Sequence, residues 1–175
     1  GGGPYHGAPI LSGLAAARSG CDLVHVAMPC DAADRSDWPA SLIPEKLPDD
    51  YHLTMSSVGV LEELMESGRA PDAIVVGPGL GREGETMEAV RAILDLALSK
   101  PTPVVVDADG IAALPRGCWP EGLEGVATPH QGEAERWLGE ASPSEALSGC
   151  SGENSTIVIT GPTDQLTGPG GRQCA

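Results

Sequence analysis

The chain has 175 residues, with 25 acidic and 10 basic side chains, a formal net charge of −15 and no phenylalanine. This length allows one domain, or an incomplete part of a larger one. The apolar runs are far shorter than the ~20 residues of a membrane-spanning helix, and the negative charge argues against a nucleic-acid-binding surface. The sequence therefore predicts a protein with no membrane span and no nucleic-acid partner.

The first half of the chain is predicted to alternate loops, helices and strands, because apolar residues recur at helical spacing in two places and form one short strand between them. Four prolines make the segment after this strand mostly loop. In chain order we expect a loop over 1–7, a helix over 10–18, a strand over 22–28, mostly loop with one helical turn over 29–50, and a helix from Ser56 or Ser57 to Gly68.

The second half is predicted to be a regular alternation of strands and helices. Its strands are apolar throughout, which is typical of a parallel sheet covered by helices on both faces. The predicted fold class is therefore α/β. In chain order we expect a strand over 73–76, a helix over 87–98, a strand over 103–106, a short helix over 111–114, a strand over 126–128, a helix over 133–138, a strand over 156–160, and a turn and strand over 164–167.

The surface is predicted to be acidic all over, because the acidic residues are dispersed and lysine is nearly absent, with only Lys46 and Lys100 against eight arginines. Such a surface repels itself in low salt and is tolerated when salt screens it. We therefore expect the protein to work in the salty cytoplasm of a halophile. An ordinary acidic protein with low lysine usage is the alternative.

The cysteines indicate neither a disulfide framework nor a zinc site, because their number is odd and no C-x-x-C occurs. They favour free thiols in a reducing cytosol, which again predicts a cytoplasmic protein. The five residues are Cys21, Cys30, Cys118, Cys150 and Cys174.

A glycine-rich turn, Gly77-Pro78-Gly79-Leu80-Gly81, follows the predicted strand over 73–76. Ligands of open α/β sheets bind at the carboxyl ends of the strands. Glycines there let backbone N–H groups approach an anion, and the next helix offers its positive end. A plain turn is the alternative. No G-K-[ST] follows, so a P-loop NTPase is disfavoured.

Two further strand ends carry polar residues. Asp107-Ala108-Asp109-Gly110 follows the strand over 103–106, and its carboxylates could bind metal, orient a ligand, or, in the case of Asp109, cap the next helix. Thr128-Pro129-His130-Gln131-Gly132-Glu133 follows the strand over 126–128. There His130 and Glu133 suit hydrogen bonding to a polar ligand, or a capped helix start.

A fourth segment, Tyr5-His6-Gly7-Ala8-Pro9, precedes the first predicted helix. Its small residues Gly7 and Ala8 permit close approach of a flat ligand. The alternative is a plain helix start with Pro9 near the first helical position.

These four segments, in this order, resemble the ADP/ATP-dependent NAD(P)H-hydrate dehydratase family, a branch of the ribokinase-like superfamily. The family has Y-x-G-A, V-x-G-P-G-L-G, D-A-D-G and T-P-H-x-G-E, followed by a strand that ends in K-G, where this chain has Thr160-Gly161. The resemblance covers nearly the whole chain. It implies a ribokinase-like three-layer α/β/α fold with a mostly parallel sheet.

The resemblance also implies a function, the nucleotide-dependent dehydration that repairs hydrated NADH or NADPH. The implied substrate is NAD(P)H hydrate, the phosphate donor is ADP or ATP, and Mg²⁺ takes part. Glu133 corresponds to a glutamate that helps to position magnesium through water, and Thr160 and Gly161 to the adenine-nucleotide site. The residues implied for the hydrated dinucleotide are Ala8, Gly79, Gly81, Asp107 and His130.

Three departures from the family pattern predict a single partial domain over residues 1–175, incomplete at both ends. The family's G-G-x-G-D segment, with its catalytic aspartate, does not occur, so no catalytic residue is assigned. Thr160 replaces the lysine of K-G. A strand expected before Gly1 is also missing. We therefore expect no dehydratase activity from these residues alone.

Two other functions remain open on the sequence. A ribokinase-like small-molecule kinase would share the fold, although T-P-H-x-G-E and Y-x-G-A favour the dehydratase. A non-catalytic nucleotide-binding module is supported by the absent G-x-G-D. In each case the partners are small molecules, a dinucleotide or an adenine nucleotide, and a homo-oligomer is allowed.

Overall fold

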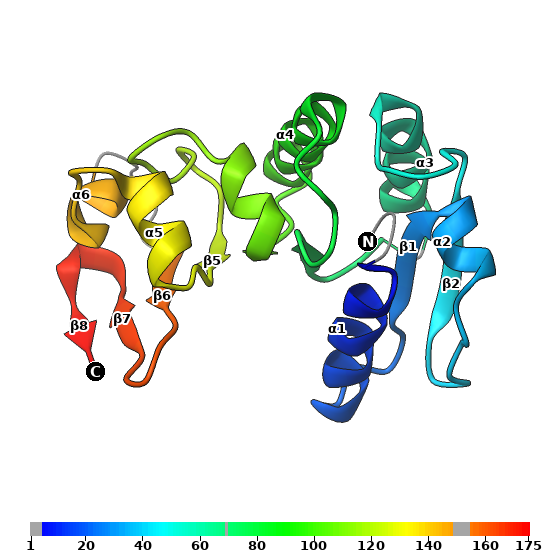
Figure 1. Ribbon diagram of the computed structural model, residues 1–175, viewed down its shortest axis with the longest axis horizontal. Helices are drawn as coiled ribbons and strands as arrows, with labels where there is room; N and C mark the ends of the chain where they lie inside the picture. The colour runs from blue at the N-terminus through cyan, green and yellow to red at the C-terminus, as the bar shows by residue number, and fades with distance from the viewer. Residues whose placement is uncertain (1–4, 69, 149–154) are drawn as a thin grey trace.

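The computed structural model describes residues 5–68, 70–148 and 155–175. In Figure 1, α1 with β1 and β2 lies at one end of the molecule and β6, β7 and β8 lie at the other, joined by the middle of the chain. The elements are α1 (Gly7–Arg18), β1 (His25–Pro29), α2 (Cys30–Asp34), β2 (Ile43–Leu47), α3 (Met55–Glu66), β3 (Ile74–Val76), α4 (Gly84–Ser99), β4 (Val104–Val106), η2 (Ala108–Ala113, a 3₁₀ helix), β5 (Gly125–Ala127), α5 (Gln131–Leu138), α6 (Pro143–Ser148), β6 (Ser155–Ile159), β7 (Gln165–Thr167), η3 (Pro169–Gly171, 3₁₀) and β8 (Gln173–Cys174).

The larger sheet has six strands in the order β3-β4-β5-β6-β7-β8. Strands β3 to β6 pair in parallel, with Val76 opposite Val106 and Val106 opposite Ala127, so their carboxyl ends coincide at one edge. Strands β7 and β8 are antiparallel to their neighbours. The α/β class and the mostly parallel sheet are therefore as predicted, with an antiparallel end.

A second sheet pairs β1 with β2 in parallel, with His25 opposite Ile43. Strand β2 lies inside the segment predicted to be mostly loop, so that prediction was wrong there. Pro44 favoured a loop in the sequence. Proline is however tolerated in edge strands, and among the described residues β2 pairs only with β1. Glu45 of β2 bonds His25 of β1 at 2.7 Å.

The main core lies between β3–β6 and the helices on one side of the larger sheet. Val104, Val106, Ala127 and Ile157 are at most 1% exposed and pack with the apolar face of α4. Trp119 is fully buried and donates its indole N–H to the carbonyl of Leu123 at 2.7 Å. Side chains on the other face of the strands are less buried, and Val75 of β3 is 52% exposed.

The β1–β2 sheet is covered on both faces. Val26 and Met28 form a small core with Ile10 and Leu14 of α1, whereas Ala27, which points the other way, packs against the main core. The β1–β2 sheet therefore has the cover on both faces that the sequence predicts. Among the described residues of β3–β5, the side that carries Val75 is the more exposed one.

No helix among the described residues has the length and apolar character needed to cross a bilayer. Four cysteines have free thiols: Cys21, Cys30, Cys118 and Cys174. Cys150 lies outside the described residues.

Two glycines bring the loops after β3 and β4 into backbone contact. Gly77 has a φ of +128°, and a Cβ at this position would overlap the carbonyl oxygen of Asp107. A Cβ on Gly110 would lie 2.9 Å from the carbonyl oxygen of Val76. Only glycine allows this approach, because any side chain would push the two loops apart.

Gly77→Ala is expected to lower the free energy of unfolding by roughly 1–3 kcal/mol or more, because a strained φ adds to the steric overlap. Urea-induced unfolding measures the change. Gly59→Ala in α3 is the matched control, because a Cβ there meets nothing within 4 Å, and it should stabilise by about 0.5–1 kcal/mol. Equal stability of the two variants would contradict the close contact of the loops.

Asp49 organises the turn before α3. Its carboxylate accepts the backbone N–H of Thr54 at 2.9 Å and the Thr54 hydroxyl at 2.6 Å. The fully buried hydroxyl of Ser57 also donates to it. Burial by itself raises the pKa of the Asp49 carboxyl, but the hydrogen bonds from Ser57 and Thr54 outweigh burial and hold the pKa below its usual range.

Replacement Asp49→Asn should therefore destabilise the protein in a pH-dependent way. Because the folded-state pKa is lowered, the contribution of Asp49 is complete above the unfolded-state pKa of about 3.9 and is lost as the pH falls through the folded-state pKa. Urea unfolding of both proteins at several pH values should show a difference at pH 7 that shrinks below about pH 4. Asp22→Asn, at an exposed position, should show no such dependence.

Candidate functional site

The sequence motifs meet at one edge of the larger sheet. Each of three of them follows the carboxyl end of β3, β4 or β5, and Thr160-Gly161 follows β6. Backbone pairing continues past these strand ends. The backbone N–H of Asp107 donates to the carbonyl of Val76 at 3.1 Å, and the backbone N–H of Thr128 donates to the carbonyl of Val106 at 3.1 Å. Parallel pairing thus places motifs far apart in sequence in neighbouring positions.

The first motif lies against the glycine-rich turn. A Cβ on Gly79 would lie 2.7 Å from the carbonyl oxygen of Tyr5 and 3.1 Å from the Cβ of Ala8, in the first turn of α1. The φ of Gly79 is +67° and that of Gly81 is +82°. Ala8, Gly79 and Gly81, all predicted to contact the dinucleotide, are therefore gathered around one turn whose backbone is accessible only because the residues are small.

Asp109 holds the glycine-rich turn in place. Its carboxylate accepts the backbone N–H of Gly81 at 3.0 Å and the Nε–H of Arg82 at 2.8 Å. The alternative that Asp109 only caps the next helix was wrong, because η2 begins after Asp107 without a side-chain cap. Asp109 reaches across to the neighbouring loop instead.

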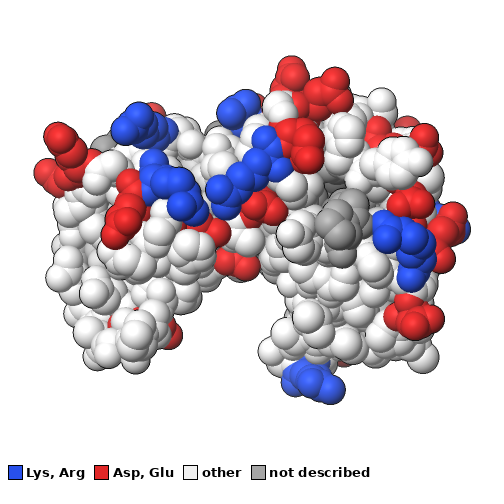
Figure 2. Space-filling model, viewed as in Figure 1, with Lys and Arg blue, Asp and Glu red and all other residues white. Residues whose placement is uncertain are grey.

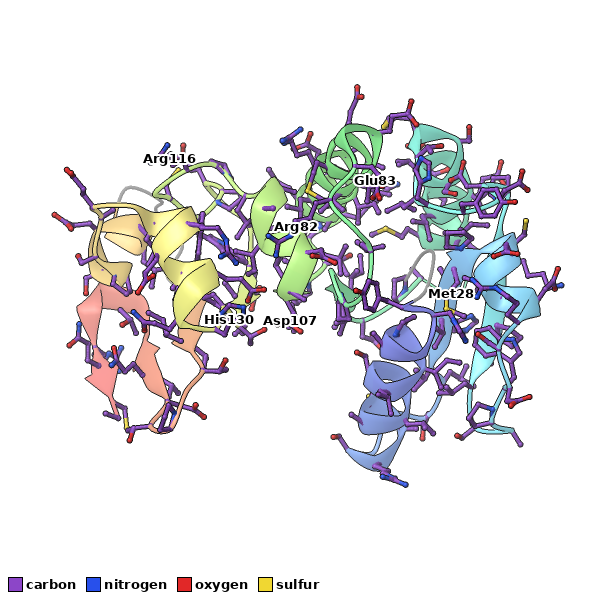
Figure 3. All side chains as sticks on the ribbon, in the orientation of Figure 1. Met28, Arg82, Glu83, Asp107, Arg116 and His130 are labelled. Carbon is purple, nitrogen blue, oxygen red and sulfur yellow. The ribbon has the colours of Figure 1, made fainter. Side chains whose placement is uncertain are left out.

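Asp107, which was predicted to contact the dinucleotide, makes a second cross-link. Its Oδ1 accepts the hydroxyl hydrogen of Thr128 at 2.8 Å, which connects the end of β4 with the end of β5. The bond from Thr128 uses only this one oxygen of the carboxylate, and Figure 3 shows Asp107 at the edge of the ribbon beside His130.

His130 and Glu133 form a reciprocal cap at the start of α5, so the capped-helix interpretation of this motif is confirmed. Nδ1 of His130 accepts the N–H groups of Gly132 at 3.0 Å and Glu133 at 3.4 Å, while Glu133 Oε2 accepts the N–H of His130 at 3.0 Å. An accepting Nδ1 places the proton of the neutral ring on Nε2. The His130 side chain is 58% exposed, so Nε2 can still donate to a ligand.

Glu133 is nearly buried, with an exposure of 8%. Its Oε1 lies 3.7 Å from Nη2 of Arg82 and 3.4 Å from Nε2 of His130. Glu133 could bind a metal directly only if its carboxylate were free of these contacts. Binding a metal through a water molecule does not require this. The described residues contain no group of three or more His, Cys, Asp or Glu side chains that could hold a metal.

Arg82 is the residue that sequence reasoning missed. Its guanidinium lies between Asp109 and Glu133, so it connects the turn after β3 with both of the following motifs. The available signal was its position directly after Gly81, as the only basic residue between β3 and α4.

Thr160 lies beside His130. The two residues form a parallel bridge, and the N–H of Thr160 donates to the carbonyl of Pro129 at 2.9 Å. The N–H of Gly161 donates to Asp164 at 3.0 Å. The segments predicted for the dinucleotide and for the adenine nucleotide are therefore direct neighbours.

The surface is hollowed next to these strand ends. Figure 2 shows a broad recess between the two ends of the molecule. Figure 3 places Asp107 and His130 at its inner edge, and Figure 1 shows α1 on one side and β6 to β8 on the other. The recess is a suitable place for an extended ligand that contacts several strand ends at once.

The arrangement matches a known family of proteins. The family model described as NAD(P)H-hydrate dehydratase matches residues 1–172. The bifunctional NAD(P)H-hydrate repair enzyme Nnr of Hyperthermus butylicus is 42% identical over 138 residues, which are 78% of this chain and 25% of the relative. The ATP-dependent (S)-NAD(P)H-hydrate dehydratase of Emericella nidulans is 32% identical over 142 residues, 75% of this chain and 38% of the relative.

Solved structures show the same fold. The crystal structure of the ADP/ATP-dependent NAD(P)H-hydrate dehydratase of Bacillus subtilis with ATP/Mg²⁺ and CoA superposes with a TM-score of 0.73 and 22% identity, over 99% of this chain and 61% of that one. A protein of Streptococcus mutans gives a TM-score of 0.72 over 97% and 60%. The chain spans 25% of the length of the Hyperthermus butylicus relative and 38% of that of the Emericella nidulans relative. On the match of the family model to nearly its whole length, the chain belongs to the NAD(P)H-hydrate dehydratase family.

Proposed function

We propose that the protein acts in nucleotide-dependent repair of hydrated NADH or NADPH, and that these residues supply the binding surface for the dinucleotide. The main support is the meeting of Y-x-G-A, G-P-G-L-G, D-A-D-G and T-P-H-x-G-E at one strand edge beside a recess. The names of the curated relatives point to the same reaction. They favour it over a small-molecule kinase.

In this proposal the dinucleotide lies across the small residues Ala8, Gly79 and Gly81 and reaches the side chains of Asp107 and His130. The glycines present backbone rather than side chains, so a flat or charged group can come close. His130 donates from Nε2, because its Nδ1 is engaged with the start of α5. Asp107 accepts hydrogen bonds from the ligand through the oxygen that Thr128 does not use.

The adenine nucleotide, ADP or ATP with Mg²⁺, is proposed to lie beside Thr160 and Gly161. Phosphoryl transfer to the ring hydroxyl turns a poor leaving group into a good one, and positioning and charge neutralisation govern such transfers. Thr160 offers a hydroxyl in place of a lysine charge, which weakens the electrostatic attraction for phosphate. Glu133 fits an indirect role, positioning magnesium through water, because its oxygens already serve the cap and Arg82.

His130→Asn tests the dinucleotide site. Asparagine is also a good N-cap, so the start of α5 should be retained while the imidazole is lost. We expect NADPH hydrate, titrated calorimetrically in the presence of ADP, to bind about three- to tenfold more weakly, as for the loss of one hydrogen bond of about 1 kcal/mol. His25→Asn, in the β1–β2 sheet where the ring bonds Glu45, is the control. Equal affinities of both variants would contradict the site.

The same mixtures, followed for loss of the hydrate, test catalysis. No G-x-G-D occurs in the chain, so we expect binding without turnover. The specific observation in favour of the second candidate function, a non-catalytic nucleotide-binding module, is Thr160 in the place of the family's lysine. Turnover by the 175-residue chain would remove that candidate, and absence of both binding and turnover would contradict the primary proposal.

We also propose that the protein works in the salty cytoplasm of a halophile, with small molecules rather than nucleic acid or membranes as partners. The net charge of −15 and the four free thiols support this setting. Self-association through the exposed Val75 side of β3–β5 is part of the same proposal, because exposed apolar surface favours association.

A salt titration checks the halophilic part. Mutual repulsion among acidic side chains is screened at high ionic strength, where the Debye length falls to about 3 Å at 1 M. The midpoint of thermal unfolding is therefore expected to rise by several degrees between about 0.05 and 1 M KCl. An unchanged or lower midpoint in molar KCl would indicate an ordinary acidic protein.

A further inference from the structure

A second hollow, of about 240 Å³, lies between η2 and α5 on the helix side of the sheet. Its lining consists of three guanidinium groups, the carboxylate of Glu133, which lies near Arg82, and an apolar floor. The basic residues are Arg82, Arg116 and Arg136, and the apolar ones are Ile111, Leu114 and Trp137. The volume is below the roughly 300–1,000 Å³ of a pocket for a whole drug-sized ligand, which favours a small charged group.

The charge at this hollow is unusual for the chain. Three of its ten basic side chains line one cavity, although the chain carries a net charge of −15. Figure 2 shows basic side chains grouped over this face, where Figure 3 places Arg82 and Arg116. Only Arg82 is neutralised, by Asp109 and Glu133. Neither Arg116 nor Arg136 forms an ion pair with any carboxylate of the described residues.

Arg136 belongs to the last turn of α5, but its guanidinium group lies near the first turn. Its side chain extends back along α5, and Nη1 lies 3.6 Å from the place of a Cβ on Gly132, in the first turn. The first turn is the positive end of a helix, where a cation is disfavoured. Arg116, whose Nη2 lies 3.6 Å from the place of a Cβ on Gly139, is at the opposite, favourable end.

The spacing of the two free guanidinium groups indicates the size of the ligand. Arg136 lies beside the first turn of α5 and Arg116 beside its C-cap, so the two guanidinium groups lie toward opposite ends of this helix. One phosphate group is too short to contact both ends with bidentate hydrogen bonds, whereas a diphosphate is closer to the required length. Guanidinium groups bind phosphate oxygens in this bidentate manner.

We propose that this hollow is an anion site for the diphosphate group of a small molecule. Arg116 and Arg136 hold its two phosphates, Arg82 closes the side toward η2, and the apolar floor lies beneath. The hollow adjoins the strand-end motifs through Arg82 and Glu133, which line it, but the proposal does not depend on the proposed repair function. Its occupant is defined by the diphosphate, which free pyrophosphate and a nucleoside diphosphate share.

Sodium pyrophosphate is the probe, in about 0.15 M salt, where the Debye length is about 8 Å and long-range attraction is screened. The indole N–H of Trp137 donates to the carbonyl of Pro115 at 2.9 Å beside the hollow, and that of Trp38 donates to Ala33 in the α1–β1–β2 part. Pyrophosphate should shift the NMR signal of the Trp137 indole, identified with Trp137→Phe, and leave that of Trp38 in place. Orthophosphate should give a weaker titration.

Two variants and a control complete the test. Arg116→Gln and Arg136→Gln should each weaken pyrophosphate binding about tenfold, as for the loss of a hydrogen bond to a charged group. Arg91→Gln, an exposed arginine of α4, should leave it unchanged. An unmoved Trp137 signal, equal binding by the parent and both variants, or an equal loss in Arg91→Gln would overturn the proposal. Competition by ADP at the Trp137 signal would identify a nucleoside diphosphate as a source, and its absence would leave free pyrophosphate.

Discussion

The contact between the backbones of Gly77 and Asp107 is the constraint on which the candidate site depends. Parallel pairing brings the ends of β3 and β4 side by side, but side chains on the two loops would normally keep them apart. Glycine at positions 77 and 110 removes that obstacle on both loops. The close approach then lets Asp109 reach the N–H of Gly81 with a normal hydrogen bond.

The carboxylates at this edge are used mainly to hold loops together. Asp109 binds the glycine-rich turn and Arg82, Asp107 binds Thr128, and Glu133 binds the backbone of His130. Each of these contacts joins segments that follow different strands or fixes the start of a helix. In the proposed function the ligand-facing surface therefore consists of backbone, small residues, one imidazole and one oxygen of Asp107, which suits recognition by shape and hydrogen bonding.

Much of this architecture could be predicted from the sequence, because the physical signals are local. Unbroken apolar runs identified β3, β4 and β6, and apolar spacing identified α1 and α4. The position of three motifs after β3, β4 and β5 was enough to place those three at one edge, since parallel strands end on the same side.

The remaining features depend on tertiary contacts that leave little trace in the sequence. Strand β2 contains Pro44 and two charged residues, and it is a strand because it pairs with β1. Helix α6 and strand β8 are too short for a periodic pattern to indicate them. The role of Arg82 arises from two carboxylates that are 27 and 51 positions further along the chain, so only the folded structure reveals it.

The bridge between His130 and Thr160 has a consequence for motion. Because the N–H of Thr160 is bonded to the carbonyl of Pro129, the segment after β6 cannot open without disturbing the segment that carries His130. Proteins open locally in contiguous cooperative units, which amide hydrogen exchange detects. These two segments therefore belong to one such unit, and a ligand that protects either segment from exchange also slows exchange in the other.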